Sequence, residues 1–352
     1  MQADGVPPAP ENEAGACAGA AAVEGSTYPL VEIKAKSYTS FTATCRFCRY
    51  LGRAAHPAVA TVLKGFVLVL IALFVPFAAV AGTSAAPISA PLSRVLAASA
   101  ATSDSSFILY RWDRFPSILI LDTVDYHFQD RMFSRLAFFL EKRGFRGRLL
   151  SNGELEKLHG WNAHDYGPEG LASFFTEVDH ERFVLNPEEE TLKELALQHG
   201  IIQTVSGGFA PGTGGVLSIS RSSSAIERRL LLVHESFHGV FFASPEYRSF
   251  CFQLWDSLDS AVRSFFIRFL DELGYDGSFR YLVVNEFQAY LMQQPARYAP
   301  DYFLRVAKRF AGEGSGVPQT AILDASHRLN DFLESRFGIV AGGSLDAEGG
   351  PQ

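Results

Sequence analysis

The pattern of apolar and polar positions predicts strands and helices in turn over the first half of the folded region. Residues 117–123 form a short apolar run, which is typical of a buried strand. Apolar side chains then recur at helical spacing over 128–143, and Gly144 is placed to end that helix. By the same criteria, helices are expected at 153–158, 168–178 and 187–198, and strands at 183–185, 201–205 and 215–220.

From residue 224 onward the pattern is almost entirely helical. Helices are predicted at 225–242, 245–273, 283–293, 300–310 and 320–337. Mixed elements followed by helices indicate an α+β fold, with a small sheet in the first half and a mainly helical second half. We expect residues 106–338 to form this one domain, and the polar residues 339–352 to form a flexible tail.

A glycine-rich segment at 207–215 separates two of the predicted strands. It lacks the Lys-Ser/Thr ending of a phosphate-binding P-loop, and its glycine spacing does not match a dinucleotide-binding fingerprint. We interpret it as a flexible loop.

The N-terminal third has a different character. Residues 1–60 show no sustained period and begin with a stretch rich in Ala, Gly and Pro, which predicts disorder. Residues 65–82 contain no charge, follow several basic residues and include a small-x-small motif at 79–81. We therefore expect 61–82 to be a membrane anchor, or a signal peptide if translation starts near residue 62, and 83–105 to be a linker. Either interpretation exports the domain from the cytoplasm.

Composition narrows the choice of function. The chain has 352 residues and a formal net charge of −7, and this mild acidity argues against a nucleic-acid partner. Four cysteines are too few for a disulfide scaffold. Cys45 and Cys48 have metal or redox spacing but no second pair beside them. Cys251 is the only cysteine of the exported part, which indicates a buried, small apolar residue.

One motif contains candidate metal ligands and a candidate general base. His234 and His238 are four residues apart in a predicted helix, so both imidazoles can reach one ion. A catalytic zinc ion needs three protein ligands and one open position, where its bound water is activated and a nearby carboxylate takes the proton. Glu235, offset by one residue, suits that carboxylate. The alternative is a helix with two incidental histidines, which is disfavoured because polar groups are costly in so apolar a segment.

Glu286 is the best source of a third ligand. It lies 48 positions after His238 in the otherwise apolar segment 282–290. The alternative is a glutamate on a solvated helix face, which its apolar neighbours disfavour. The other acids that could supply the third ligand, here called the rival acids, are predicted to lie on the polar face of the helix 245–273. They are Asp256, Asp259, Asp271 and Glu272.

The motif His234-Glu235-Ser236-Phe237-His238, followed by Asn285-Glu286-Phe287-Gln288-Ala289, resembles the gluzincin branch of the zincin-like metallopeptidases. The resemblance covers roughly residues 215–295. It implies a zincin-like fold, a peptide or protein substrate, Zn²⁺ bound by His234, His238 and Glu286, and Glu235 as the base that activates water. Tyr290 stands where some members have an acid that orients a ligand histidine, so that role has no candidate.

The resemblance also implies a strand before the motif helix whose edge pairs with an extended substrate. Residues 215–220 fit this strand, so we expect Gly215, Val216 and Leu217 to bind substrate through their main chain. The alternative is an ordinary interior strand. A hydrolase of this type also stabilises an oxyanion. Tyr298, which follows the helix of Glu286, is one candidate, but nothing in the sequence selects it and a core or surface role is favoured. The other available side chains are Tyr290, Tyr302, Arg297 and His127.

These observations favour an exported or membrane-anchored zinc metallopeptidase, in contact with the membrane through 65–82 if that segment is not cleaved. Two alternatives stay open: a zinc-dependent hydrolase of a non-peptide substrate, and a non-catalytic surface protein that contains zinc. The segment 160–166, dense in polar and aromatic residues, would either line a cleft or form a capped loop around Trp161.

Overall fold

The computed structural model describes residues 86–98, 105–311 and 316–343. The predictions for 1–60, for 61–82 and for most of the tail lie outside these residues. Within the described part of the chain, no helix has both the length and the apolar character needed to cross a membrane.

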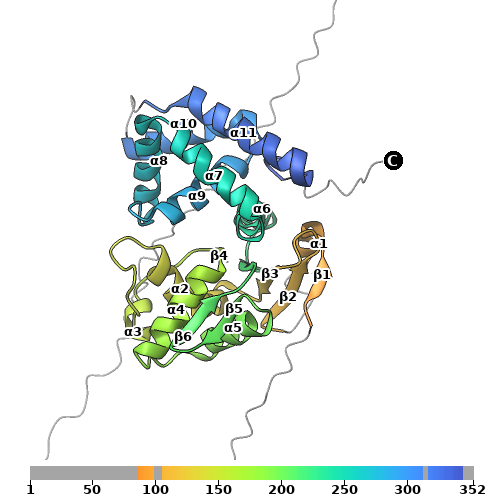
Figure 1. Ribbon diagram of the computed structural model, residues 1–352, viewed down its shortest axis with the longest axis vertical. Helices are drawn as coiled ribbons and strands as arrows, with labels where there is room; N and C mark the ends of the chain where they lie inside the picture. The colour runs from red at the N-terminus through yellow and green to blue at the C-terminus, as the bar shows by residue number, and fades with distance from the viewer. Residues whose placement is uncertain (1–85, 99–104, 312–315, 344–352) are drawn as a thin grey trace, which may run out of the picture. The chain divides into compact units, whose positions relative to one another are not determined.

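The fold is α+β, as the sequence pattern predicts, and its centre is a five-stranded mixed sheet of order β1-β2-β3-β7-β4 (Figure 1). β3 (Ile118–Thr123) and β7 (Gly215–Ser220) are parallel neighbours in the middle. β2 (Phe107–Trp112) pairs antiparallel with β3, and β1 (Ile88–Ala90) pairs parallel with β2. β4 (His164–Tyr166) pairs antiparallel with β7 and forms one edge of the sheet.

Both faces of the central strands are buried, because their side chains point alternately to two separate cores. Leu119 and Leu121 of β3 join the core shared with α2, α4 and α5, whereas Ile118 and Ile120 join the core of the helical half. The first core thus lies under three helices, α2 (Tyr126–Leu140), α4 (Pro168–His180) and α5 (Pro187–Gln198).

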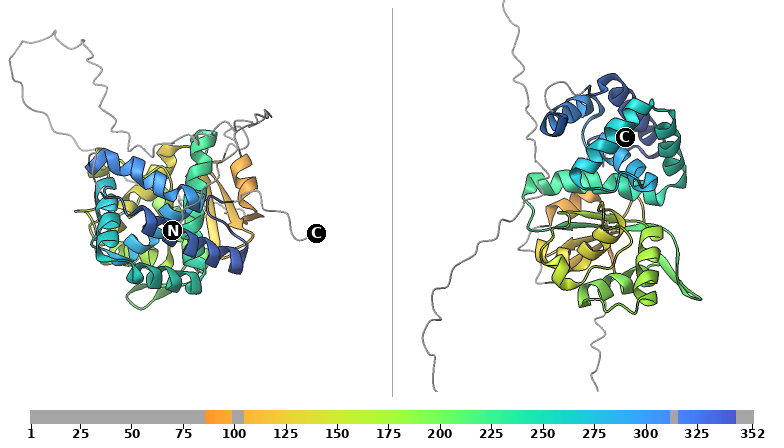
Figure 2. Two further views of the ribbon diagram at one scale, coloured as in Figure 1. Left: turned by 90° about the horizontal axis from the view of Figure 1, so that it is seen from above. Right: turned by 90° about the vertical axis from the view of Figure 1, so that its left-hand side faces the viewer.

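The second half is helical and lies on the opposite face of the sheet (Figures 1 and 2). Its aromatic rings interlock: the Phe266 ring lies 4.8 Å from that of Phe287 and 5.0 Å from that of Phe303. The helices are α6 (Ala225–Ala243), α7 (Pro245–Ser257), α8 (Ser260–Leu273), α9 (Arg280–Met292), α10 (Ala299–Ala311) and α11 (Gln319–Phe337), with the short 3-10 helix η2 (Ala296–Tyr298) between α9 and α10.

The start of α6 is held to the sheet by a buried ion pair. The guanidinium of Arg228 donates two hydrogen bonds, of 2.8 and 2.7 Å, to the carboxylate of Asp122 on β3. It also donates to the Val95 carbonyl of α1 (Leu92–Ala97) at 2.7 Å. Three segments far apart in the chain are therefore joined where the motif helix begins.

The predicted linker 83–105 is corrected by the same contacts. It contains β1 and α1, and Val95 is fully buried in the core of the helical half. These elements escaped the sequence pattern because three and six residues are too short to show a period.

Four other expectations were wrong in detail. The predicted helix 245–273 is interrupted after Ser257, where α8 begins at Ser260. The glycine-rich segment contains a strand, β6 (Gly208–Pro211), which forms a hairpin with β5 (Ile202–Val205). Residues 183–185 form no strand. The tail is packed at its start, because the Gly342 amide donates to the Met292 carbonyl at 2.7 Å.

Candidate metal centre

The motif helix α6 lies unusually close to the sheet. A side chain in place of Gly239 would come within 3.2 Å of Leu217 and 3.3 Å of Trp112, which is tighter than nearly all real contacts of this kind. The glycine after the second histidine therefore allows a close approach of α6 to the sheet. This approach brings His234, Glu235 and His238 into the interior of the protein.

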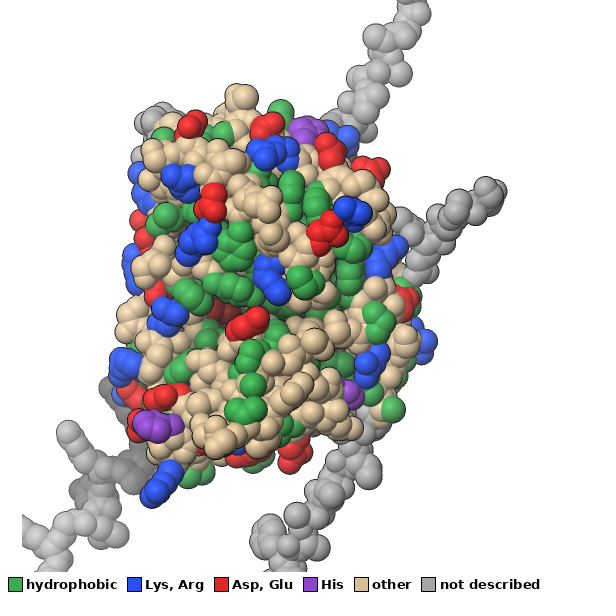
Figure 3. All heavy atoms as spheres, in the orientation of Figure 1, with side chains coloured by type: hydrophobic (Ala, Val, Ile, Leu, Met, Phe, Trp, Pro, Cys, Tyr) green, Lys and Arg blue, Asp and Glu red, His purple; other side chains and the backbone are tan. Residues whose placement is uncertain are grey.

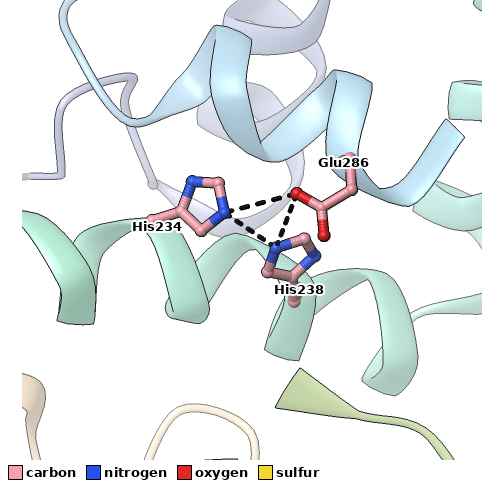
Figure 4. Close-up of side chains that lie close together, drawn as sticks. All are labelled: His234, His238 and Glu286. Atoms are coloured by element: carbon pink, nitrogen blue, oxygen red, sulfur yellow. Dashed lines mark hydrogen bonds and ion pairs between the residues drawn. The ribbon is translucent and has the colours of Figure 1, made fainter. Parts of the chain in front are cut away.

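Three side chains converge from α6 and α9 (Figure 4). The Nε2 atoms of His234 and His238 lie 3.1 Å apart. Oε2 of Glu286 lies 3.5 Å from the His234 Nε2 and 3.8 Å from the His238 Nε2. Ligands bound tetrahedrally to zinc at about 2.0–2.1 Å lie about 3.3 Å from one another. The three donor atoms thus have nearly the spacing of three corners of a zinc tetrahedron.

Burial and unsatisfied atoms also suit a cation. His234 is 4% exposed, His238 0% and Glu286 1%, and the Glu286 Oε2 is buried without a hydrogen bond. Burial lowers the pKa of His238 to about 4, with His234 contributing, so that its imidazole is neutral at neutral pH. A neutral imidazole is the form that binds a metal ion. The residues therefore fit a zinc ion, whose binding stays a prediction.

Glu235, the predicted base, lies next to His238 in the interior. It is 4% exposed, and its Oε2 has no hydrogen-bond partner. Ligand atoms of Asp165, Glu235 and His238 lie within 4.8 Å of one another. Burial, followed by the charges of Glu286 and Glu141, raises the pKa of the Glu235 carboxyl well above its usual range. A divalent cation nearby would reverse this effect, because it stabilises the ionised carboxylate.

The structure supplies the orienting residues that the sequence left without a candidate. Asp165 of β4 places its Oδ2 3.4 Å from the His238 Nδ1 and accepts a hydrogen bond from the Asn285 amide at 3.1 Å. The Gln293 Oε1 lies 2.9 Å from the His234 Nδ1. The His234 Nδ1 is thus within hydrogen-bond distance of Gln293, whereas the His238 Nδ1 makes no hydrogen bond to the described residues and has Asp165 as its nearby carboxylate. Both contacts lie on the side of the ring away from the Nε2 atoms, where residues that orient metal-binding histidines are found. The polar-aromatic segment 160–166 was the only sign of Asp165 in the sequence.

Replacing Asp165 by Ala is expected to lower the zinc affinity about 10–100-fold, because the His238 Nδ1 loses its nearby carboxylate. Competition with a chromogenic chelator measures this affinity. Asp113→Ala, an exposed aspartate after β2, is the matched control and should leave the affinity unchanged. An Asp165→Ala protein that binds zinc as tightly as wild type would remove the orienting role.

The predicted substrate strand is corrected. β7 is an interior strand, paired with β3 on one side and β4 on the other, so Val216 and Leu217 have a partner strand on both sides, and Gly215 pairs with Ile118 of β3. The edge belongs to β4 instead. The sequence pattern did not predict β4 because the strand has only three residues, all of them titratable, and so shows no apolar alternation.

The other candidate residues do not belong to the three converging donor atoms of the proposed metal site. Tyr298 lies in η2 with the Arg297 guanidinium 4.8 Å above its ring, and its part in substrate binding stays a prediction. The rival acids are elsewhere: Asp256 pairs with Arg280 at the surface. Cys251 is fully buried, and burial raises the pKa of its thiol, which confirms its interpretation as a core residue.

Comparisons of this chain with protein-family models, with curated proteins and with solved structures found no match. The functional inferences therefore depend on the geometry of the site itself.

Proposed function

We propose that the protein is a zinc-dependent peptidase, with His234, His238 and Glu286 as the zinc ligands. The observation that carries this proposal is the spacing of 3.1, 3.5 and 3.8 Å between their three donor atoms, combined with the unpartnered carboxylate of Glu235 beside them. Three protein ligands leave one coordination position for water or substrate, as catalytic rather than structural zinc sites do.

The roles of the chain's own residues follow from their positions. Zinc in this site would polarise the scissile carbonyl and lower the pKa of a water molecule. The Oε2 of Glu235, which has no other partner, would accept the proton of the attacking water and pass it to the leaving amine. Asp165 and Gln293 would keep the two imidazoles in position during these steps.

A peptide is the substrate that suits this surface best. β4 ends the sheet, and its Asp165 side chain reaches His238, so the edge of the sheet lies beside the proposed ligands. An extended peptide can add to such an edge through main-chain hydrogen bonds. Figure 3 shows apolar side chains across the middle of one face, with acidic side chains set among them, at the level of β4 in Figure 1.

The proposal also includes export from the cytoplasm. It is based on residues 65–82, which lie outside the described part of the chain. Their uncharged run and the basic residues before them would place the domain outside the cytoplasm.

The proposal is tested by metal removal. The purified full-length protein should contain about one zinc ion per chain and cleave a mixture of unstructured peptides, detected by mass spectrometry of the products. Treatment with 1,10-phenanthroline should abolish cleavage, and added zinc should restore it. Cleavage that persists after the zinc has been removed would contradict a zinc peptidase.

One observation favours a second candidate, a non-catalytic protein in which zinc joins α6 to α9 within the helical half. The proposed ligands are at most 4% exposed, as is usual for structural zinc sites. In that case the zinc-loaded protein would cleave no peptide, and removing the zinc would lower its melting temperature.

A further inference from the structure

Lys142 and Trp161 contact each other near the N-terminal end of β4. Lys142 follows α2, and its ammonium nitrogen lies 2.8 Å from the centre of the Trp161 ring. Trp161 precedes β4 by three residues. The positive charge is thus held beside the sheet edge that the proposed function uses.

This pair is fixed in place from several sides. The Trp161 ring stacks on Tyr275 at 4.6 Å, and its Nε1 donates to the Glu141 carboxylate at 2.6 Å. Lys142 and Tyr275 are also joined by a backbone bridge. Tyr290, whose electrostatic neighbours include Tyr275, packs its ring 4.7 Å from that of His234. A continuous row of contacts therefore leads from the proposed zinc ligand to Lys142.

The ammonium of Lys142 has no ion pair within the described part of the chain. Glu141 and Glu286 act on it electrostatically, but neither lies within ion-pair distance. Burial is the main effect and lowers the pKa of Lys142 to about 7. A bound anion would stabilise this charge, because a carboxylate at hydrogen-bond distance makes a charge-assisted contact.

The chain direction of β4 indicates which side of a bound peptide would face the Lys142 charge. An extended peptide that adds to β4 in the more stable antiparallel orientation runs against the chain direction of β4. The C-terminal side of the peptide then lies toward Trp161, and its scissile bond would lie beside Asp165 and His238. Four residues of extended chain, from 161 to 165, span at most about 13 Å, so the charge meets the peptide within a few residues of the cleaved bond.

We propose that Lys142, supported by Trp161, is a subsite for a carboxylate on the C-terminal side of the scissile bond. This inference rests on the proposed function and names its substrate class, peptides that carry a carboxylate a few residues after the cleaved bond. The carboxylate is either the free C-terminus of the peptide or an acidic side chain.

Binding to an inactive variant tests the subsite without relying on turnover. The full-length Glu235→Gln protein, loaded with zinc, is titrated with N-terminally labelled hexapeptides Ala-Ala-Phe-Leu-Ala-Ala, and fluorescence anisotropy gives the Kd. One peptide has a free C-terminus, one a C-terminal amide, and one an amide with Glu as its last residue. At least one of the two anionic peptides should bind about tenfold or more tightly than the neutral amide, and the tighter one identifies the source of the carboxylate.

Adding Lys142→Met should remove this preference, whereas Lys142→Arg should keep most of it. Lys157→Met, at an exposed lysine near in sequence, is the matched control and should change nothing. Lys142→Gln is a second neutral variant, and zinc content and melting temperature show whether each variant is folded. Equal binding of all three peptides, or a preference that survives in the folded Lys142→Met or Lys142→Gln protein, would overturn the subsite.

These outcomes are distinct from failure of the proposed function. If the protein with Glu235 intact binds zinc but cleaves no peptide, the peptidase proposal fails. The dependence of peptide binding on Lys142 is measured independently of that result.

Discussion

Glu235→Gln is expected to lower kcat for peptide cleavage by about 10²–10⁴-fold while zinc stays bound. The amide cannot accept a proton from water, but it has nearly the size of the carboxylate. Glu235 is not among the three converging donor atoms, so its replacement should leave the zinc stoichiometry at the wild-type value. Steady-state kinetics and metal analysis of the same preparation measure both quantities.

Glu227→Gln is the matched control, because Glu227 is the only other glutamate of α6 and lies at its N-terminal end. It should retain wild-type kcat. A Glu235→Gln protein with wild-type peptidase activity would exclude Glu235 as the base. Loss of zinc from that variant would instead show that Glu235 is a ligand.

Glu286→Ala is expected to weaken zinc binding by roughly 100-fold or more, beyond the 10–100-fold typical of an orienting residue. The change removes one of three donor atoms from a site in which its Oε2 has no other hydrogen bond. It also leaves the two imidazoles without the anion that partly balances a bound cation. Zinc content after dialysis, and affinity from chelator competition, measure the effect.

Glu272→Ala serves as the control, since Glu272 is exposed near the end of α8 and was one of the rival acids. It should bind zinc as wild type does. Unchanged zinc stoichiometry and affinity in Glu286→Ala would refute the assignment of Glu286 and, with it, the resemblance to gluzincins.

The helices were predictable where local signals mark their ends. The prediction for α5 matches the structure at both ends, because Pro187 opens the helix, Asn186 caps it and Gly200 follows. The interruption between α7 and α8 was missed. The apolar pattern runs through it, and the loop geometry at Leu258 is not encoded by a glycine or proline.

The candidate site was predictable as far as its chemistry depends on helical spacing. His234 and His238 share a face of α6 because they are one turn apart, and the apolar surroundings of Glu286 indicated a buried carboxylate. Its distance from the two imidazoles depends on how α6 and α9 pack, a contact between residues about 50 positions apart.

The sequence by itself therefore determined the α+β order of elements, the motif helix and three candidate ligands, since these follow from local period and residue chemistry. Only the tertiary structure decided that β7 is interior and β4 the edge, and that Asp165 and Gln293 lie beside the histidines. Strand neighbours and orienting contacts arise from packing between residues far apart in the chain. A three-residue strand such as β4 is too short for its own sequence pattern to indicate that packing.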